Sequence, residues 1–171
     1  RAPYTYLWTY CDSGQICTSA VWDNVPAGTY SLVVTDKSDC QTDPKIIYLA
    51  TNGDLPLIPK GKEGETGLNA KNGWASFSSD TSGFTKMILR RAAGEEIDVI
   101  DKVEDQLNFK LTGLAPGDYV LTCTLPEGEV RYAEFSIAQY IPIALFVNNI
   151  NHASRPDASD GSVTLQITGG V

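Results

Sequence analysis

Hydrophobic and polar residues alternate with a period of two along most of this chain, which is the pattern of half-buried β-strands. Near the start, Tyr4, Tyr6 and Trp8 fall on one face of such a strand. Similar strands recur at roughly ten-residue spacing with turn residues between them, as in antiparallel β-sandwiches. They cover residues 30–35, 45–49, 74–78, 85–90, 107–111, 118–124 and 132–137. The pattern therefore predicts an all-β fold.

Four segments are less regular. Residues 55–58 could form a first strand, whereas the Gly-, Lys- and Glu-rich segment 59–67 is predicted to be a mobile loop. Residues 95–106 combine charges with β-branched side chains and are expected to form irregular strand and loop. The apolar run 141–147 contains a proline and is either a strand or a linker.

Two motifs occur twice, which indicates an internal repeat. Residues 157–165 parallel 69–77, and residues 25–32 parallel 114–121, with nearly equal separations. We therefore expect two tandem immunoglobulin-like sandwiches, one of them split across the chain termini. The predicted domains are 52–140, which is complete, and 141–171 followed by 1–51, where the strand 162–168 and the turn Gly169–Val171 lead into the first strand. A longer polypeptide or a neighbouring copy would complete the split domain.

The second motif predicts a structural corner in each unit. Gly28 and Gly117 can adopt the positive φ of a corner turn. The tyrosines that follow, Tyr30 and Tyr119, can pack inward and return their hydroxyl groups to the backbone, as in the tyrosine corner of immunoglobulin-like domains. We expect Tyr30 and Trp8 to be buried in one core and Tyr119 in the other.

Composition and net charge argue against several classes of function. The chain of 171 residues has a net charge of −8 and a pI near 4.5, which argues against nucleic-acid binding. No segment approaches the ~20 apolar residues of a membrane-spanning helix. His152 is the only histidine and is predicted to be a solvated loop residue, so we expect neither a zinc site nor an enzyme.

The four cysteines suggest an oxidising exterior. A disulfide between Cys11 and Cys17 would close a hairpin, and Cys123 is expected to be a buried free thiol. Cys40 has no obvious partner, and pairing with Cys11 or Cys17 stays open.

The sequence contains candidates for two kinds of ligand site. Asp157 and Asp160 flank a turn that could lie near Asp12, which makes a calcium site possible, although plain turn chemistry explains the pattern better. A set of aromatic residues could form a sugar-binding platform but is more typical of a core; it comprises Tyr4, Tyr6, Trp8, Trp22, Tyr30 and Trp74. The alternative function is thus a carbohydrate- or calcium-binding module of a secreted multidomain protein.

In wrapped order, residues 145–171 followed by 1–50 resemble the SprB-type repeat of large bacterial gliding and adhesion surface proteins. The resemblance is carried by Asp160–Thr164, Thr168–Gly170, Pro3–Trp8, Pro26–Asp36 and Cys40. Residues 52–140 look like a divergent relative. The family often has a cysteine before the Asp-Gly turn as partner for the one at Cys40, and residues 148–157 contain none.

The resemblance implies export to the cell surface by the type IX route and a structural, adhesive role in an extracellular fibre or stalk. The expected partner is another copy or an adjacent repeat, arranged head to tail. The residues expected to form that contact are Tyr4, Tyr6, Trp8, Val163, Leu165 and Ile167. A covalent tandem array, a polymer in which one copy lends a strand to the next, and closure within one chain all remain open.

Overall fold

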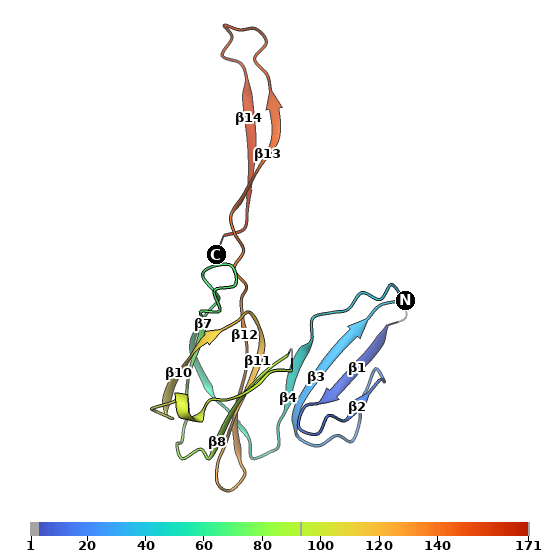
Figure 1. Ribbon diagram of the computed structural model, residues 1–171, viewed down its shortest axis with the longest axis vertical. Coiled ribbons are helices and arrows are strands. Elements are labelled where there is room, and N and C mark those ends of the chain that lie inside the picture. Colours follow the sequence, from blue (N-terminus) through green and yellow to red (C-terminus); the bar gives the residue numbers. More distant parts are fainter. Residues whose placement is uncertain (1–3, 93, 171) are drawn as a thin grey trace.

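The computed structural model describes residues 4–92 and 94–170 and confirms the all-β prediction. Within these ranges there is no α-helix, and the only helical element is the 3₁₀ turn η1 (Ile100–Lys102). Figure 1 shows three parts: a central sandwich, a smaller sheet beside it and a long two-stranded ribbon that extends from one end. We call them the body, the head sheet and the hairpin.

The body is a β-sandwich made from β5 to β12. One sheet has the strand order β10-β7-β6 and the other β5-β12-β11-β8-β9. This is the arrangement of an immunoglobulin-like domain, in which two sheets enclose one core. The strands are β5 (Leu55–Pro56), β6 (Ile58–Glu63), β7 (Gly73–Ser78), β8 (Lys86–Arg91), β9 (Glu96–Asp98), β10 (Asn108–Leu114), β11 (Gly117–Thr124) and β12 (Val130–Ile137).

The core of the body lies between these two sheets. Inward-facing side chains alternate with outward-facing ones along each strand, as the period-two pattern requires. The largest side chains without any exposure include Met87 and Leu121, and the phenyl rings of Phe77 and Phe109 lie 5.8 Å apart between their centroids. Cys123 is buried here as a free thiol.

The head sheet contains β1 (Thr5–Tyr10), β2 (Ile16–Cys17), β3 (Gly28–Thr35) and β4 (Lys45–Leu49), in the order β2-β1-β3-β4. Its strand β4 lies against β11 and β12 of the body (Figure 1). Thr29 and Ile46 are buried on this side, as are Ile88 and Val120 on the outward-facing side of β8 and β11. One face of the head sheet is therefore packed on the body.

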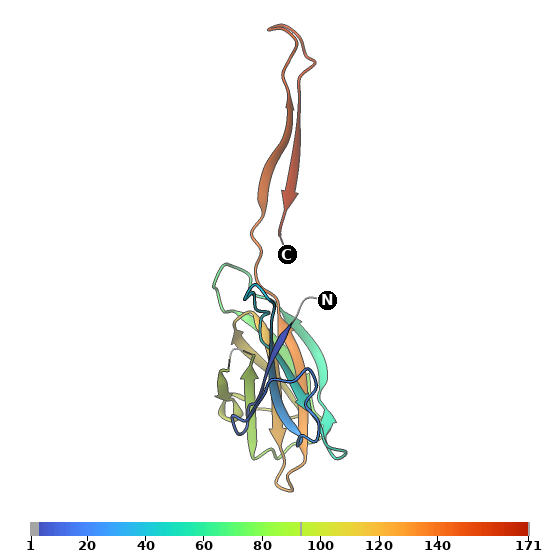
Figure 2. The same ribbon diagram turned by 90° about the vertical axis from the view of Figure 1, so that its right-hand side faces the viewer.

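The hairpin consists of β13 (Ala144–Asn151) and β14 (Ser162–Thr168), which pair only with each other among the described residues. It extends away from the body in both views (Figures 1 and 2). We expect residues 162–168 to pair with residues 1–50 of the same chain or of a neighbouring copy, and among the described residues this pairing does not occur within one chain. Pro3 and the end of the predicted turn at Val171 lie outside the described residues.

One loop prediction is wrong. Residues 59–63, expected to be mobile, belong to β6. Pro59 and Gly61 are tolerated because β6 is an edge strand with a bulge between these two residues. The segment 95–106 forms the short strand β9 and η1, in keeping with its irregular pattern.

Both corner motifs have the same geometry. Gly28 and Gly117 have φ angles of 144° and 140°. The hydroxyl of Tyr30 donates to the Pro26 carbonyl at 2.5 Å, and that of Tyr119 donates to the Ala115 carbonyl at 2.8 Å. Both tyrosines are buried. Each hydroxyl thereby satisfies a carbonyl at the turn that leads into β3 or β11.

The contribution of the tyrosine corner to stability can be measured in the body. Tyr119→Phe should lower the free energy of unfolding by about 1 kcal/mol, because one internal hydrogen bond is lost. Tyr119→Ala should lower it by about 3–5 kcal/mol, because a cavity also forms. Urea unfolding would measure both. Tyr4→Phe is the control, since Tyr4 is 55% exposed; equal stability of Tyr119→Phe and wild type would contradict a stabilising corner.

Candidate assembly interface

The head sheet carries an aromatic face that no second sheet covers among residues 4–92 and 94–170. Cross-strand pairing places Tyr6 opposite Val34, Trp8 opposite Leu32, and Tyr10 opposite Tyr30, so their side chains share one face. This face points away from the side that packs on the body. We call this set, together with Ile47 of β4, the aromatic face: Tyr6, Trp8, Tyr10, Tyr30, Leu32, Val34 and Ile47.

In the body the same positions are fully covered. Aligning the two corners places Tyr30 on Tyr119 and Leu32 on Leu121, and the strand pairing then places Trp8 on Leu89. Leu89 and Leu121 are buried beneath the sheet that contains β7. Trp8 and Leu32 are only half-buried. The expected closed core around Trp8 is therefore not formed within this chain, because its second layer is missing.

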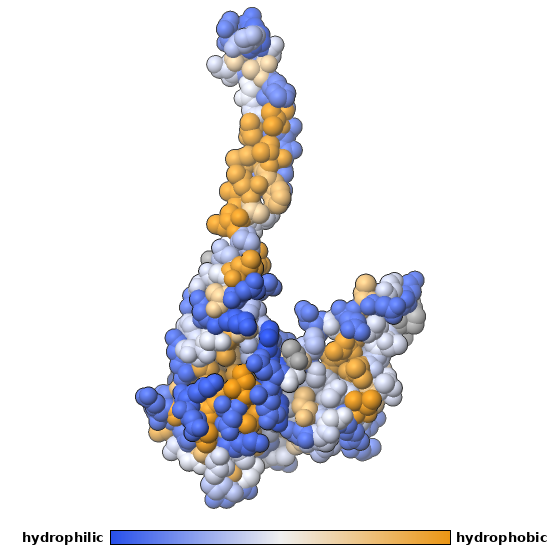
Figure 3. Space-filling view, viewed as in Figure 1, coloured by the Kyte–Doolittle hydropathy of each residue, from blue (hydrophilic) through white to orange (hydrophobic). Residues whose placement is uncertain are grey.

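The hairpin has the complementary defect. One face of the ribbon is aliphatic, while the other is mainly Asn, Thr, Ser and Gln with Phe146. The aliphatic side chains are between 51% and 67% exposed, and they form a continuous hydrophobic surface along the hairpin (Figure 3). We call this set the aliphatic face: Leu145, Val147, Ile150, Val163, Leu165 and Ile167.

The hairpin repeats the register of β6 and β7 in the body. The motif alignment places Val163 on Ala75 and Leu165 on Phe77. Leu165 pairs with Val147 as Phe77 pairs with Pro59, and the next residue of each first strand is bulged. In the body, Ala75 and Phe77 point into the core and cover β8 and β11. The hairpin is thus built like the strand pair that covers the equivalent sheet.

Both uncovered faces are costly in water. An isolated two-stranded hairpin is at best marginally stable, and a large exposed apolar patch usually marks an interaction site. Covering six aliphatic side chains that are each more than half exposed would contribute on the order of 5–10 kcal/mol, before the entropic cost of association is subtracted. The aliphatic face is therefore the part of the hairpin that would gain most from being covered.

Polar contacts fix the head sheet on the body and leave its aromatic face outward. Arg90 of β8 forms an ion pair with Asp12 at 2.6 Å and donates to the Thr29 hydroxyl at 3.3 Å. At the other end of this junction, the rings of Tyr48 and Tyr132 lie 4.7 Å apart. An open cleft of about 500 Å³ lies between these contacts.

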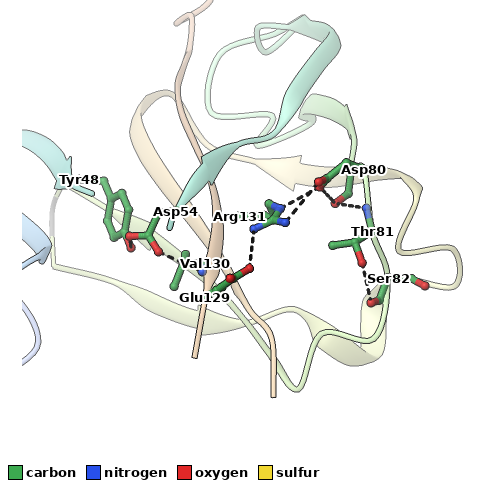
Figure 4. Close-up of polar contacts among 9 residues, drawn as sticks. Tyr48, Asp54, Asp80, Thr81, Ser82, Glu129, Val130 and Arg131 are labelled. Atoms are coloured by element: carbon green, nitrogen blue, oxygen red, sulfur yellow. Dashed lines mark hydrogen bonds and ion pairs between the residues drawn. The ribbon is translucent and has the colours of Figure 1, made fainter. Parts of the chain in front are cut away.

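Asp54 organises that second end (Figure 4). Its carboxylate accepts hydrogen bonds from the Tyr48 hydroxyl at 3.0 Å, the Thr51 N–H at 2.8 Å and the Val130 N–H at 3.1 Å. Burial opposes ionisation of Asp54, but these hydrogen bonds lower its pKa overall. Burial, together with the Asp54 carboxylate, raises the pKa of Tyr48. Through Tyr48, the head sheet is thereby tied to the segment that precedes β5 and to the first residue of β12.

Arg131 supplies a separate tie inside the body (Figure 4). Its guanidinium is largely buried and donates to both carboxylate oxygens of Asp80, at 2.8 and 3.2 Å. Its Nη1 lies 3.7 Å from Glu129. The bond to Arg131 lowers the pKa of Asp80. This contact joins β12 to the turn after β7 and is structural.

The structure does not bring the three candidate calcium ligands together. Asp12 is engaged by Arg90 beside the head sheet, while Asp157 and Asp160 lie in the loop of the hairpin. Asp160 accepts a hydrogen bond from the Ser154 N–H at 2.9 Å, as in ordinary turn chemistry. No cluster of three His, Cys, Asp or Glu side chains suited to a metal ion occurs among residues 4–92 and 94–170.

The predicted disulfide between Cys11 and Cys17 is not formed, and all four cysteines are free thiols. The reason is register: Cys17 pairs with Trp8 across β1 and β2, whereas Cys11 lies beyond the end of β1. Cys40 is exposed and also free.

Not every predicted core aromatic is in a core. Tyr4 is exposed, and Trp74 is half-buried on the outer side of β7, where it donates to Glu63 at 2.8 Å and stacks under Lys110. Trp22 packs edge-on against Tyr30. His152 is exposed in the hairpin loop, as expected.

Comparison with protein-family models gives no match for this chain, and comparison with curated proteins gives none either. The resemblance to the SprB-type repeat therefore stays a prediction. Within the part of the chain that the structure describes, no helix has the length and apolar character needed to cross a membrane.

The stability of the junction between the head sheet and the body should depend on pH through Asp54. Because its folded pKa lies below the unfolded value, its contribution is present above about pH 4 and is lost as the pH falls through the folded pKa. Asp54→Asn should lower the free energy of unfolding near pH 7 by about 1–3 kcal/mol. The variant should also lose less stability than wild type between about pH 5 and pH 3.

Urea unfolding followed by tryptophan fluorescence would test this. Asp157→Asn is the control near neutral pH, since that carboxylate is exposed in the hairpin loop. Identical pH profiles for Asp54→Asn and wild type would show that Asp54 does not stabilise the junction.

Proposed function

We propose that this protein is a structural repeat unit that assembles head to tail, with the hairpin of one copy covering the aromatic face of the next. The observation that carries the proposal is the shared register. The hairpin has the pairing and bulge of β6 and β7, and the head sheet has the strand order of β8, β9, β11 and β12. In the body, the equivalent strands pack face to face around one core, which supports this contact.

A second copy is a better partner than the same chain. The root of the hairpin is tied to the body, because the Glu65 N–H donates to the Ala138 carbonyl at 3.1 Å and Gly64 packs closely against Ala138. Its stem is closed by a hydrogen bond from the Gly170 N–H to the Ile141 carbonyl at 2.9 Å. Beyond these two ties the hairpin is directed away from the body (Figure 1).

Such a contact joins two different surfaces, so each added copy leaves one hairpin and one aromatic face free. A contact of this kind extends into a filament unless the rotation between copies closes a ring. The same interface would serve adjacent repeats of a covalent array. Together with the net charge of −8 and the resemblance to surface adhesins, this supports a structural, adhesive role in an extracellular bacterial fibre.

Substitutions on the two faces of the hairpin should separate assembly from folding. Leu165→Asp should weaken assembly at least about 100-fold, because docking would bury an unpaired carboxylate at a cost of several kcal/mol. Gln166→Asp is the matched control, since Gln166 lies on the polar face of the same strand. Static light scattering at increasing protein concentration would measure both variants.

A mixing experiment tests the two halves of the interface directly. Leu165→Asp disables the hairpin, and Leu32→Asp should disable the aromatic face. Neither variant should assemble alone, but mixing them should give a heterodimer that does not grow, because each supplies the functional surface that the other lacks. Analytical ultracentrifugation would measure this. Wild-type protein that stays monomeric at high concentration, with both ends intact, would overturn the proposal.

A further inference from the structure

The hairpin supplies only two strands, whereas the covering sheet of the body has three. In the body, β7 is the central strand and is flanked by β6 on one side and β10 on the other. In the hairpin, β14 corresponds to β7 and pairs with β13 alone. Docking the hairpin would therefore leave one edge of β14 without a partner, and an open edge of this kind is normally covered.

We infer that residues 19–25 of the receiving copy form the missing third strand, pairing antiparallel with β14 of the incoming copy. The inference rests on the head-to-tail assembly proposed above and specifies its partner segment and register. The occupant is a second copy, as in the head-to-tail contact. Residues 19–25 are the counterpart of β10, because they lie between β2 and β3 just as β10 lies between β9 and β11.

The corner motif fixes how the two segments align. Placing Tyr30 on Tyr119 also places Val25 on Leu114 and Trp22 on Leu111. It places Asn24 on Gly113, and these two residues have φ angles of 56° and 74°. Positive φ is uncommon in non-glycine residues, although asparagine tolerates it better than most. Residues 19–25 thus share the backbone kink that marks the end of β10.

The segment already lies along the aromatic face. The indole Nε1 of Trp8 donates to the Ser19 carbonyl at 3.1 Å, and the ring of Trp22 packs edge-on against Tyr30 with a centroid distance of 5.6 Å. Residues 19–25 nevertheless form no strand, and Val21 is 65% exposed. In the body β10 pairs with β7, whereas in the described part of the chain no strand pairs with residues 19–25.

The register follows from β10 and β7. In the body, Lys110 pairs with Ser76 and Leu111 with Ala75. The corresponding pairs between copies are Val21 with Thr164 and Trp22 with Val163. In this register Trp22 would point into the new core, as Leu111 does in the body. Val21 and Thr164 would lie side by side on the outer surface.

Cysteine cross-linking between copies tests this register. Val21→Cys and Thr164→Cys are placed on separate chains in which Cys11, Cys17 and Cys40 are replaced by Ser. Cys123 can stay, because it is buried and burial raises its pKa to about 12. Opposed residues in an antiparallel pair are close enough for a disulfide, so mixing and mild oxidation should link the two kinds of chain into covalent dimers.

The control pairs Val21→Cys with Gln166→Cys, which is displaced by two residues on the same face of β14. Diagonal neighbours are about 7–8 Å apart, so this pair should give at least about five-fold less dimer. Light scattering on the same cysteine-substituted chains reports assembly separately. Assembly without the Val21–Thr164 cross-link, or equal yields for both pairs, would overturn the third strand and leave the head-to-tail contact standing. Wild-type protein that does not assemble would overturn both the third strand and the head-to-tail contact.

Discussion

A β-sheet can bury one apolar face only against a second layer, and this requirement governs the whole molecule. The body meets it with two sheets around one core. The head sheet meets it on one side only, where Thr29 and Ile46 pack on the body, and leaves the aromatic face half-covered. The hairpin does not meet it at all. The two incomplete parts are complementary, because the head sheet lacks a covering layer and the hairpin has the register of the strand pair that forms such a layer in the body.

The body serves as an internal reference for that complementarity. Its strands show which residues become buried when a hairpin of this register covers a sheet of this order, and they do so without reference to another protein. The junction contacts of Arg90 and Asp54 then have a clear role. They hold the head sheet by its other face, so that the aromatic face stays directed outward and available to a second layer.

Much of this was predictable from local sequence patterns. Period-two alternation located most strands, and the Gly-x-Tyr motif located both corners, because these features depend on neighbouring residues. The face-to-face packing of the head sheet on the body was not predictable. Arg90, Asp12 and Tyr48 carry no local signal for it and are distant in sequence. The predicted disulfide between Cys11 and Cys17 was wrong for a related reason, because the register of β1 and β2 places Cys17 beside Trp8 and not beside Cys11.

The attachment of the hairpin has a mechanical consequence. Its root is anchored at Ala138 and its stem closes at Ile141, so only Gln139 and Tyr140 lie between the two ties. Pro142 restricts its own φ and the conformation of the residue before it. A joint this short allows little bending between the body and the hairpin. A filament built through it would have a long persistence length and would transmit tension along the strands of the hairpin as shear.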